Sequence, residues 1–214
     1  MNYALHESIA WPGDLEGAES PKHLAFLGRV RVLEVGDELG EYCAKVLAGL
    51  GADVVRIEPP GGALTRTYGP FLDDEPHPDR SLYFWHHNLG KRSMVLDLDS
   101  ATDQERFRQL AAHADVIVDS RPRDYLRERG LGYDDLREIN PGLIYARISP
   151  FGDVGPWRDY AGSDLVHLAL GGVMMNCGYD PDPVLGYDTP PIAPQMWQAY
   201  YIAGEMAAMS ILAA

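Results

Sequence analysis

Apolar runs and segments with helical spacing alternate along the chain, and this alternation predicts the fold. An apolar run from Val30 to Val35 is followed by a segment with helical spacing and then by a second apolar run at 53–58. Gly49 and Gly51 mark the end of the intervening helix. A strand, a helix and a strand within ~30 residues form a βαβ unit, whose right-handed crossover makes the two strands parallel.

The same alternation continues to the end of the chain. Further strands are predicted at 93–98, 114–119 and 143–148, and helices at 101–113, 121–129, 133–139, 164–175 and 196–214. Ser100 and Asp164 stand where the N-cap residues of two of these helices belong. The pattern predicts an α/β fold, a Rossmann-like open parallel sheet with helices on both faces.

Two long connections interrupt this pattern. Residues 59–90 are rich in proline, glycine and aspartate, and the aromatic residues at 83–85 are expected to anchor this connection to the core. Residues 178–194 are similarly rich in proline and aspartate. Connections of this length in a compact domain commonly carry function.

The two ends of the chain differ in character. Residues 1–25 are polar and irregular and are interpreted as an N-terminal arm, and 26–214 as the Rossmann-like portion. The apolar helix at the other end stops at Ala214 without a glycine cap or a closing basic residue. This end predicts either a missing continuation or a partner chain.

Composition narrows the classes of function. The chain has 214 residues, with 18 basic and 32 acidic side chains, and its net charge of −14 argues against nucleic acid or an anionic membrane as partner. No apolar run approaches the ~18 residues of a membrane span, and Met1 is not followed by a signal-like segment. Cys43 and Cys177 share no metal-ligand spacing. We therefore expect a cytoplasmic protein with reduced thiols and no metal.

Parallel sheets bind ligands at the carboxyl ends of their strands, here at 36–38 and 58–60. Glu58 stands where a dehydrogenase would hold a ribose hydroxyl. Asp37 and Glu38, however, occupy the turn where a glycine-rich loop would approach a diphosphate, and two carboxylates there are repulsive. A methyltransferase, whose ligand is cationic, avoids this repulsion but requires more glycine. No redox cofactor is therefore expected.

Several segments, in order and spacing, resemble the family III CoA-transferases, over nearly all of residues 24–214. They are LGADVVRIEPPGG, NLGKRSMVLDLDS, ADVIVDSRPRDYL, LGYDDLREINPGLIYARISPFGDVGP and YAGSDLVHLALGGVMMNCG. The group includes formyl-CoA, carnitine and benzylsuccinate CoA-transferases and the alpha-methylacyl-CoA racemases. The resemblance implies a longer chain in interlocked homo- or hetero-oligomers, so the second domain would be absent here.

The resemblance implies transfer of CoA between an acyl-CoA and a carboxylic acid. In the family an aspartate attacks the thioester and passes through a mixed anhydride and an aspartyl-CoA thioester. The matching position in this chain is Tyr200, and a phenol cannot replace that carboxylate. The nearest upstream acid, Asp188, is the fallback nucleophile. Glu38 stands where formyl-CoA transferase has a glutamine that supports the acyl intermediates.

The resemblance also places the contacts to CoA. The predicted CoA-binding residues are Lys91, Arg92, Leu96, Arg121 and Arg123, whereas three positions that are cationic in formyl-CoA transferase hold Pro59, Asp99 and Glu128. Losing those cations weakens phosphate binding. An alternative interpretation of the pair at 91–92 is a solvated turn before a strand.

Two interpretations of function stay open. In the first, the chain is a CoA-transferase. In the second, it is a non-catalytic subunit or fragment of a heteromeric CoA-transferase, whose partner supplies the missing aspartate. Racemase activity is disfavoured, because the histidine of that branch is replaced by Ser163 and its aspartate by Tyr200. His167, one helical turn further on, is expected to be a packed helix residue.

Overall fold

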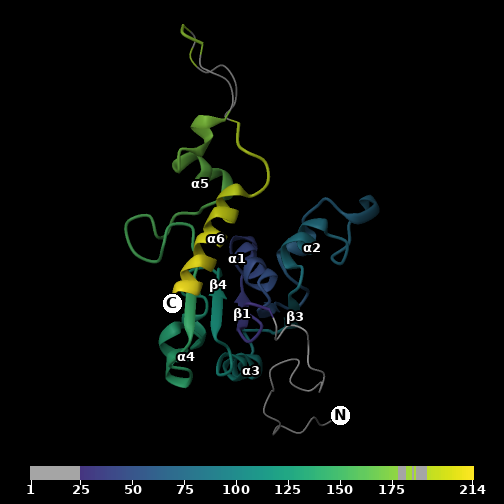
Figure 1. Ribbon diagram of the computed structural model, residues 1–214, viewed down its shortest axis with the longest axis vertical. Coiled ribbons are helices and arrows are strands. Elements are labelled where there is room, and N and C mark those ends of the chain that lie inside the picture. Colours follow the sequence, from purple (N-terminus) through teal and green to yellow (C-terminus); the bar gives the residue numbers. More distant parts are fainter. Residues whose placement is uncertain (1–24, 178–181, 185, 187–191) are drawn as a thin grey trace.

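A computed structural model describes residues 25–177, 182–184, 186 and 192–214 (Figure 1). Its five strands are β1 (Arg31–Val35), β2 (Asp53–Glu58), β3 (Arg92–Val95), β4 (Val116–Asp119) and β5 (Ile144–Arg147). They form one sheet in the order β3-β2-β1-β4-β5, and every neighbouring pair is parallel. The predicted α/β fold with a parallel sheet is confirmed. The predicted N-terminal arm lies outside the described residues, apart from its last residue.

Six α-helices accompany the sheet. They are α1 (Glu38–Gly49), α2 (Leu82–Asn88), α3 (Ala101–Ala111), α4 (Tyr133–Ile139), α5 (Asp164–Leu170) and α6 (Gln198–Ala213), as counted in the described part of the chain. Short 3₁₀ helices, each about one turn long, lie at Leu64–Thr67, Leu72–Asp74, Arg127–Arg129 and Val173–Asn176. The helix predicted at 121–129 is thus reduced to a turn, and the one predicted at 164–175 ends five residues early, before a 3₁₀ turn.

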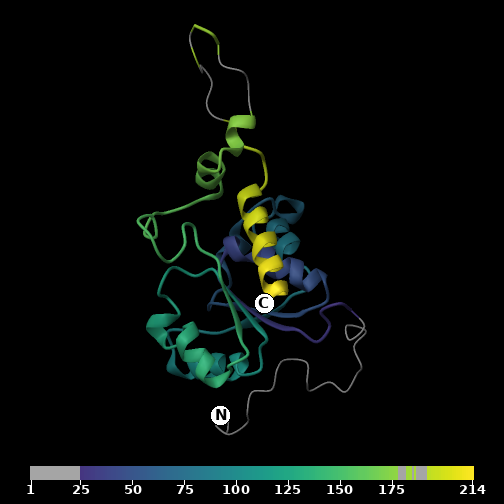
Figure 2. The ribbon, with the colours of Figure 1, turned by 60° about the vertical axis from the view of Figure 1, so that its left-hand side comes forward.

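The strands build two separate cores because successive side chains point to opposite faces of a sheet. Leu33 belongs to the face covered by α3 and α4, where Phe107 and Leu110 are fully buried. The adjacent Val32 belongs to the other face, which α1 and α6 cover with residues such as Leu47. Figures 1 and 2 show α6 running beside α1, on the side of the sheet away from α3 and α4. Both faces of the sheet are covered, as predicted.

The connection at 59–90 is more ordered than the sequence suggested. Helix α2 begins at Ser81, whose hydroxyl accepts a hydrogen bond from Phe84 N (3.0 Å). Tyr83 and Phe84 are buried, as predicted for an anchor, whereas Trp85 is exposed. A helix of only seven residues inside a proline-rich segment has too few turns to produce a recognisable periodicity.

The start of α5 corrects the predicted role of Asp164. The N-cap of α5 is Ser163, whose hydroxyl accepts a hydrogen bond from Val166 N (3.3 Å). The Asp164 carboxylate instead accepts hydrogen bonds from Ala199 N (2.8 Å) and Tyr200 N (3.1 Å). The N-cap residue of α6, Trp197, makes no capping hydrogen bond with its side chain. A carboxylate from α5 therefore satisfies the first amides of α6 and favours its positive end.

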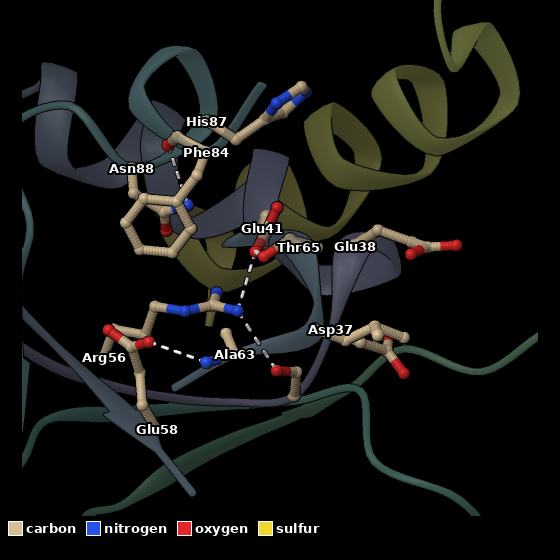
Figure 3. Close-up of polar contacts among 12 residues, drawn as sticks. Asp37, Glu38, Glu41, Arg56, Glu58, Ala63, Thr65, Phe84, His87 and Asn88 are labelled. Carbon is tan, nitrogen blue, oxygen red and sulfur yellow. Dashed lines mark hydrogen bonds and ion pairs between the residues drawn. The ribbon is translucent and has the colours of Figure 1, made fainter. Parts of the chain in front are cut away.

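Four charged side chains lie buried between β1, β2, α1 and the residue before β3. Arg56 contacts Glu34 and Glu41, and Lys91 Nζ lies 2.7 Å from Glu34 Oε2. Each of these side chains is at most 1% exposed. Figure 3 shows Glu41 above the Arg56 guanidinium, to which it is joined by an ion pair of 2.7 Å. Charges buried this deeply are tolerated because they compensate one another.

Candidate functional site

The carboxyl ends of β1 and β4 lie side by side where the strand order reverses. From β1 the chain continues to β2 and β3 on one side, whereas β4 and β5 lie on the other. In open parallel sheets this switch point is where ligands bind. Here Ser120 N donates to Val35 O (3.0 Å), and Asp37 N donates to Ser120 Oγ (3.1 Å). The residues that follow both strands therefore surround one opening.

A cleft of about 670 Å³ opens at this switch point. Its walls are the first turn of α1, the residues after β4, the loop after β5 and the start of α6. Its ionisable side chains are Asp37, Glu38, Tyr68, Arg121, Arg123, Arg147, Asp153, Arg158, Asp159, Tyr160 and Tyr200. The cleft thus contains four carboxylates and four arginines, so neither charge is in excess among its acidic and basic side chains.

Glu38 is the first residue of α1. The helix begins there because the Asp37 carboxylate accepts a hydrogen bond from Leu39 N (3.4 Å). The Tyr68 hydroxyl donates a hydrogen bond to Glu38 Oε2. Burial raises the pKa of Glu38 above its usual value of 4.5, the Tyr68 bond opposes this rise, and the charge of Asp37 adds to it. In Figure 3 the Glu38 side chain extends away from Arg56.

Tyr200 lies in the first turn of α6 and is 6% exposed. Its ring centroid is 6.0 Å from that of His167, on α5. Burial, together with the charges of Glu38 and Asp37, raises the pKa of Tyr200 to about 12. At neutral pH the residue is a neutral phenol, which can donate a hydrogen bond but is no carboxylate nucleophile.

Arg121 joins the cleft to two further hollows along the same edge of the sheet. One, of about 240 Å³, lies between the ends of β1, β2 and β3, and the other, of about 360 Å³, lies beside the loop after β2. Its guanidinium lies 4.2 Å from the centre of the Tyr125 ring. Its Nε is buried without a hydrogen-bond partner, and none of the described carboxylates forms an ion pair with it. A cation that lines all three spaces and pairs with none of the described carboxylates suits an anion such as a phosphate.

Comparison with known proteins identifies the family. A family model described as CoA-transferase family III matches residues 27–214. The chain belongs to CoA-transferase family III. It is 40% identical over 182 residues to the Succinyl-CoA:(R)-benzylsuccinate CoA-transferase subunit BbsE of Thauera aromatica, covering 85% of this chain and 44% of that protein. It is 41% identical over 162 residues to the Succinyl-CoA:mesaconate CoA-transferase of Haloarcula hispanica, covering 73% of this chain and 41% of that protein.

Solved structures of the family agree with the fold. The crystal structure of a CAIB/BAIF family protein from Brucella suis matches with a TM-score of 0.76 and 32% identity, over 86% of this chain and 47% of that chain. A crystal structure of Rv3272 from Mycobacterium tuberculosis matches with a TM-score of 0.75 and 31% identity, over 89% and 50%. The chain spans about half of the length of these relatives or less.

Two of the predicted CoA-binding cations are engaged elsewhere. Lys91 Nζ is buried against Glu34 (2.7 Å) and donates to Glu41 O (2.9 Å). Arg92, the first residue of β3, forms an ion pair with Asp53 at the start of β2. Arg92 therefore lies at the amino-terminal end of β3, away from the ligand edge, and Lys91 lies beneath the surface. This placement favours a structural role for the pair at 91–92.

The other predicted site residues lie at the carboxyl edge or beyond the described part. Leu96 follows β3 and lines the 240 Å³ hollow, together with Arg121. Arg123 lines the cleft and pairs with Asp159 at its rim. Asp188, the fallback nucleophile, lies outside the described residues. Arg121, Arg123 and Leu96 therefore lie at one edge of the sheet, and their contact with CoA stays a prediction.

Three contributors to the site were missed from the sequence. Tyr68 comes from the long connection, where no pattern marked it. Ser120, directly after an apolar strand, carried a readable signal, because a hydroxyl at a strand end in a parallel sheet faces the ligand edge. The contact of Asp164 with the first turn of α6 joins residues far apart in sequence, so local capping rules could not find it.

Two searches of the described residues gave negative findings. Within them, no three histidine, cysteine, aspartate or glutamate side chains are grouped to hold a metal ion. None of the helices in the described part combines the length and apolar character that crossing a bilayer requires.

Proposed function

We propose that this chain supplies the CoA-binding edge of a CoA-transferase, which moves CoA between an acyl-CoA and a carboxylic acid. The observation that carries the proposal is Arg121, a cation that lines all three hollows at their junction. CoA has a nucleotide, a diphosphate and a long acyl-bearing arm, and a single junction that reaches all three spaces suits such a molecule.

The chemistry of the hollows supports one direction of binding. The 240 Å³ hollow is lined by Pro59, Leu96, Leu98 and Tyr125, which offer apolar and aromatic surface to an adenine ring. The diphosphate would lie against Arg121. The acyl arm would then extend into the 670 Å³ cleft, where the charged side chains gather. Several relatives are named for succinyl-CoA, which makes succinyl-CoA the first donor to test.

The binding proposal is tested by calorimetric titration of CoA into the wild-type chain and the Arg121→Gln variant. One charge-assisted phosphate contact contributes roughly 1.5–3 kcal/mol, so the variant should bind CoA about tenfold to a hundredfold more weakly. The matched control is Arg106→Gln, because Arg106 is 52% exposed on α3 and pairs only with Asp103 among the described residues. Equal affinity in all three proteins, or no binding by the wild type, would contradict the proposal.

A second candidate is a non-catalytic subunit of a heteromeric CoA-transferase. Two features favour it. Tyr200, a phenol, stands at the position that the resemblance assigns to the family's aspartate, and one relative carries the word subunit in its name. The two candidates differ in a transfer assay with succinyl-CoA and a second acid. The chain alone transfers CoA in the first case, whereas in the second case transfer requires an added family III chain that bears the aspartate.

A further inference from the structure

We propose that Glu38 is the carboxylate that attacks the acyl-CoA thioester in this chain, in place of the aspartate that Tyr200 replaces. The inference rests on the proposed function, because it requires an acyl-CoA in the cleft. It assigns the nucleophile to α1 rather than to α6.

The first support is position. Glu38 and Tyr200 line the same cleft, Glu38 from the first turn of α1 and Tyr200 from the first turn of α6. Arg121 lines this cleft as well and connects it to the hollow proposed for the nucleotide. An acyl group at the end of the CoA arm is therefore delivered to the space that Glu38 faces.

The second support comes from the other carboxylates of the cleft. Asp37 caps α1 through Leu39 N. Asp153 pairs with Arg147, and Asp159 pairs with Arg123 and Arg158 at the rim; these contacts hold both side chains against arginines. Of the four carboxylates that the described residues bring to the cleft, Glu38 is the one with neither an arginine partner nor a capping role.

The third support is the environment of the carboxylate itself. Tyr68 donates to Oε2, which fixes the orientation of the side chain, while Oε1 accepts no hydrogen bond from the described residues. Burial raises the pKa of Glu38, so its anion is more basic than that of an exposed glutamate. A more basic carboxylate is the stronger nucleophile, provided that the pH keeps it ionised.

The proposed steps balance without an added reagent. A Glu38 oxygen forms a bond to the acyl carbonyl carbon while the carbon–sulfur bond breaks, which gives a mixed anhydride and CoA thiolate. The thiolate then attacks the glutamyl carbonyl carbon, releases the first acid as its carboxylate and leaves a glutamyl-CoA thioester. The acceptor carboxylate attacks that thioester, which releases CoA thiolate and forms a second mixed anhydride. The thiolate then attacks the acceptor's carbonyl carbon, which gives the new acyl-CoA and releases the Glu38 carboxylate.

The test is to incubate the chain with succinyl-CoA, add hydroxylamine, and locate the product by peptide mass spectrometry. Hydroxylamine converts a glutamyl thioester or anhydride to a hydroxamate at that residue. We expect the hydroxamate at Glu38 in the wild type, its loss in Glu38→Gln, and its retention in Glu205→Gln, an exposed glutamate on α6. Glu38→Gln keeps the acceptor for Tyr68, and its folding and CoA affinity should match the wild type.

Each outcome decides the question. A hydroxamate at Asp188 or elsewhere, but not at Glu38, overturns the inference and leaves the proposed function standing. Binding of succinyl-CoA without any adduct also overturns it and favours the non-catalytic subunit. If the wild type binds neither CoA nor succinyl-CoA, the proposed function fails and the inference falls with it. Because the wild-type mapping alone gives these answers, they hold even if a variant fails to fold.

Discussion

Replacing Lys91 with methionine should lower stability and leave the affinity for CoA unchanged. The Lys91 ammonium lies 2.7 Å from Glu34 Oε2, and it donates to Glu41 O at 2.9 Å and to Asn88 Oδ1 at 3.0 Å. Its side chain is 1% exposed, so these contacts are shielded from water. Methionine preserves much of the volume but removes the charge and all three contacts.

The magnitude follows from the burial of both partners. Removing one member of a buried ion pair costs about 3–5 kcal/mol, because the remaining charge has lost its compensation. Arg56 still contacts Glu34 in the variant, which places the expected loss at the lower end, about 3 kcal/mol. Urea unfolding followed by tryptophan fluorescence measures this loss as a lower midpoint at an unchanged slope.

The control for the loss of stability is Arg106→Met, which removes an exposed pair with Asp103 and should cost less than about 1 kcal/mol. CoA titration of the folded Lys91→Met protein supplies the second measurement. A stability loss below about 1 kcal/mol together with weaker CoA binding would refute the reasoning. Such a result would return Lys91 to the ligand site that the family resemblance implied.

Three further predictions follow from local geometry. Asp164→Ala should lower the free energy of unfolding by about 1–2 kcal/mol, because it removes the acceptor at the start of α6, whereas Asp164→Asn, which keeps an acceptor oxygen, should lose less in thermal unfolding. Gly40→Ala should lower the free energy of unfolding by about 1–3 kcal/mol, since a Cβ would lie 2.7 Å from Ser120 Oγ. Its control is Gly49→Ala in the same helix, where a Cβ meets nothing within 4 Å, and this variant should raise the free energy of unfolding by about 0.4–1 kcal/mol. Urea unfolding measures both changes. Formation of the Glu38 adduct should fall as the pH drops through the pKa of Glu38, which lies above 4.5, because the carboxylate must be ionised to attack. The raised pKa also means that the folded protein binds this proton more tightly than the unfolded chain does, so the free energy of unfolding falls as the pH rises through the same window. Glu38→Gln should remove this contribution to the pH dependence.

The sheet was predictable because its strands are nearly continuous apolar runs separated by helical spacing. Val32 and Leu33 face opposite cores, so both positions need an apolar residue, which is the signature of a sheet covered on both sides. Boundaries were less accurate: β3 ends at Val95 rather than at 98, because the apolar residues at 96 and 98 pack into the core from the loop after the strand.

The site was only partly predictable, because its decisive contacts join distant parts of the chain. Arg121 and Arg123 were predicted from the family resemblance, and both line the cleft beyond the carboxyl ends of the strands. Lys91 was predicted to bind CoA, with a solvated turn as the alternative. Its burial could not be read from the sequence, because its partner Glu34 lies 57 residues away in a strand. Tyr68 becomes part of the site only when the long connection folds back over α1. Local patterns describe elements, whereas these contacts depend on how the elements are packed.

The four buried charges have a consequence for how this sequence can vary. A single substitution at Glu34, Glu41, Arg56 or Lys91 leaves an ion without its counterpart in a region that water does not reach. Two or more simultaneous changes, such as replacement of an acid and a base by apolar residues of similar size, restore neutrality. The four positions should therefore change together rather than singly. Directed evolution that varies one codon at a time should recover no tolerated substitution at any of them.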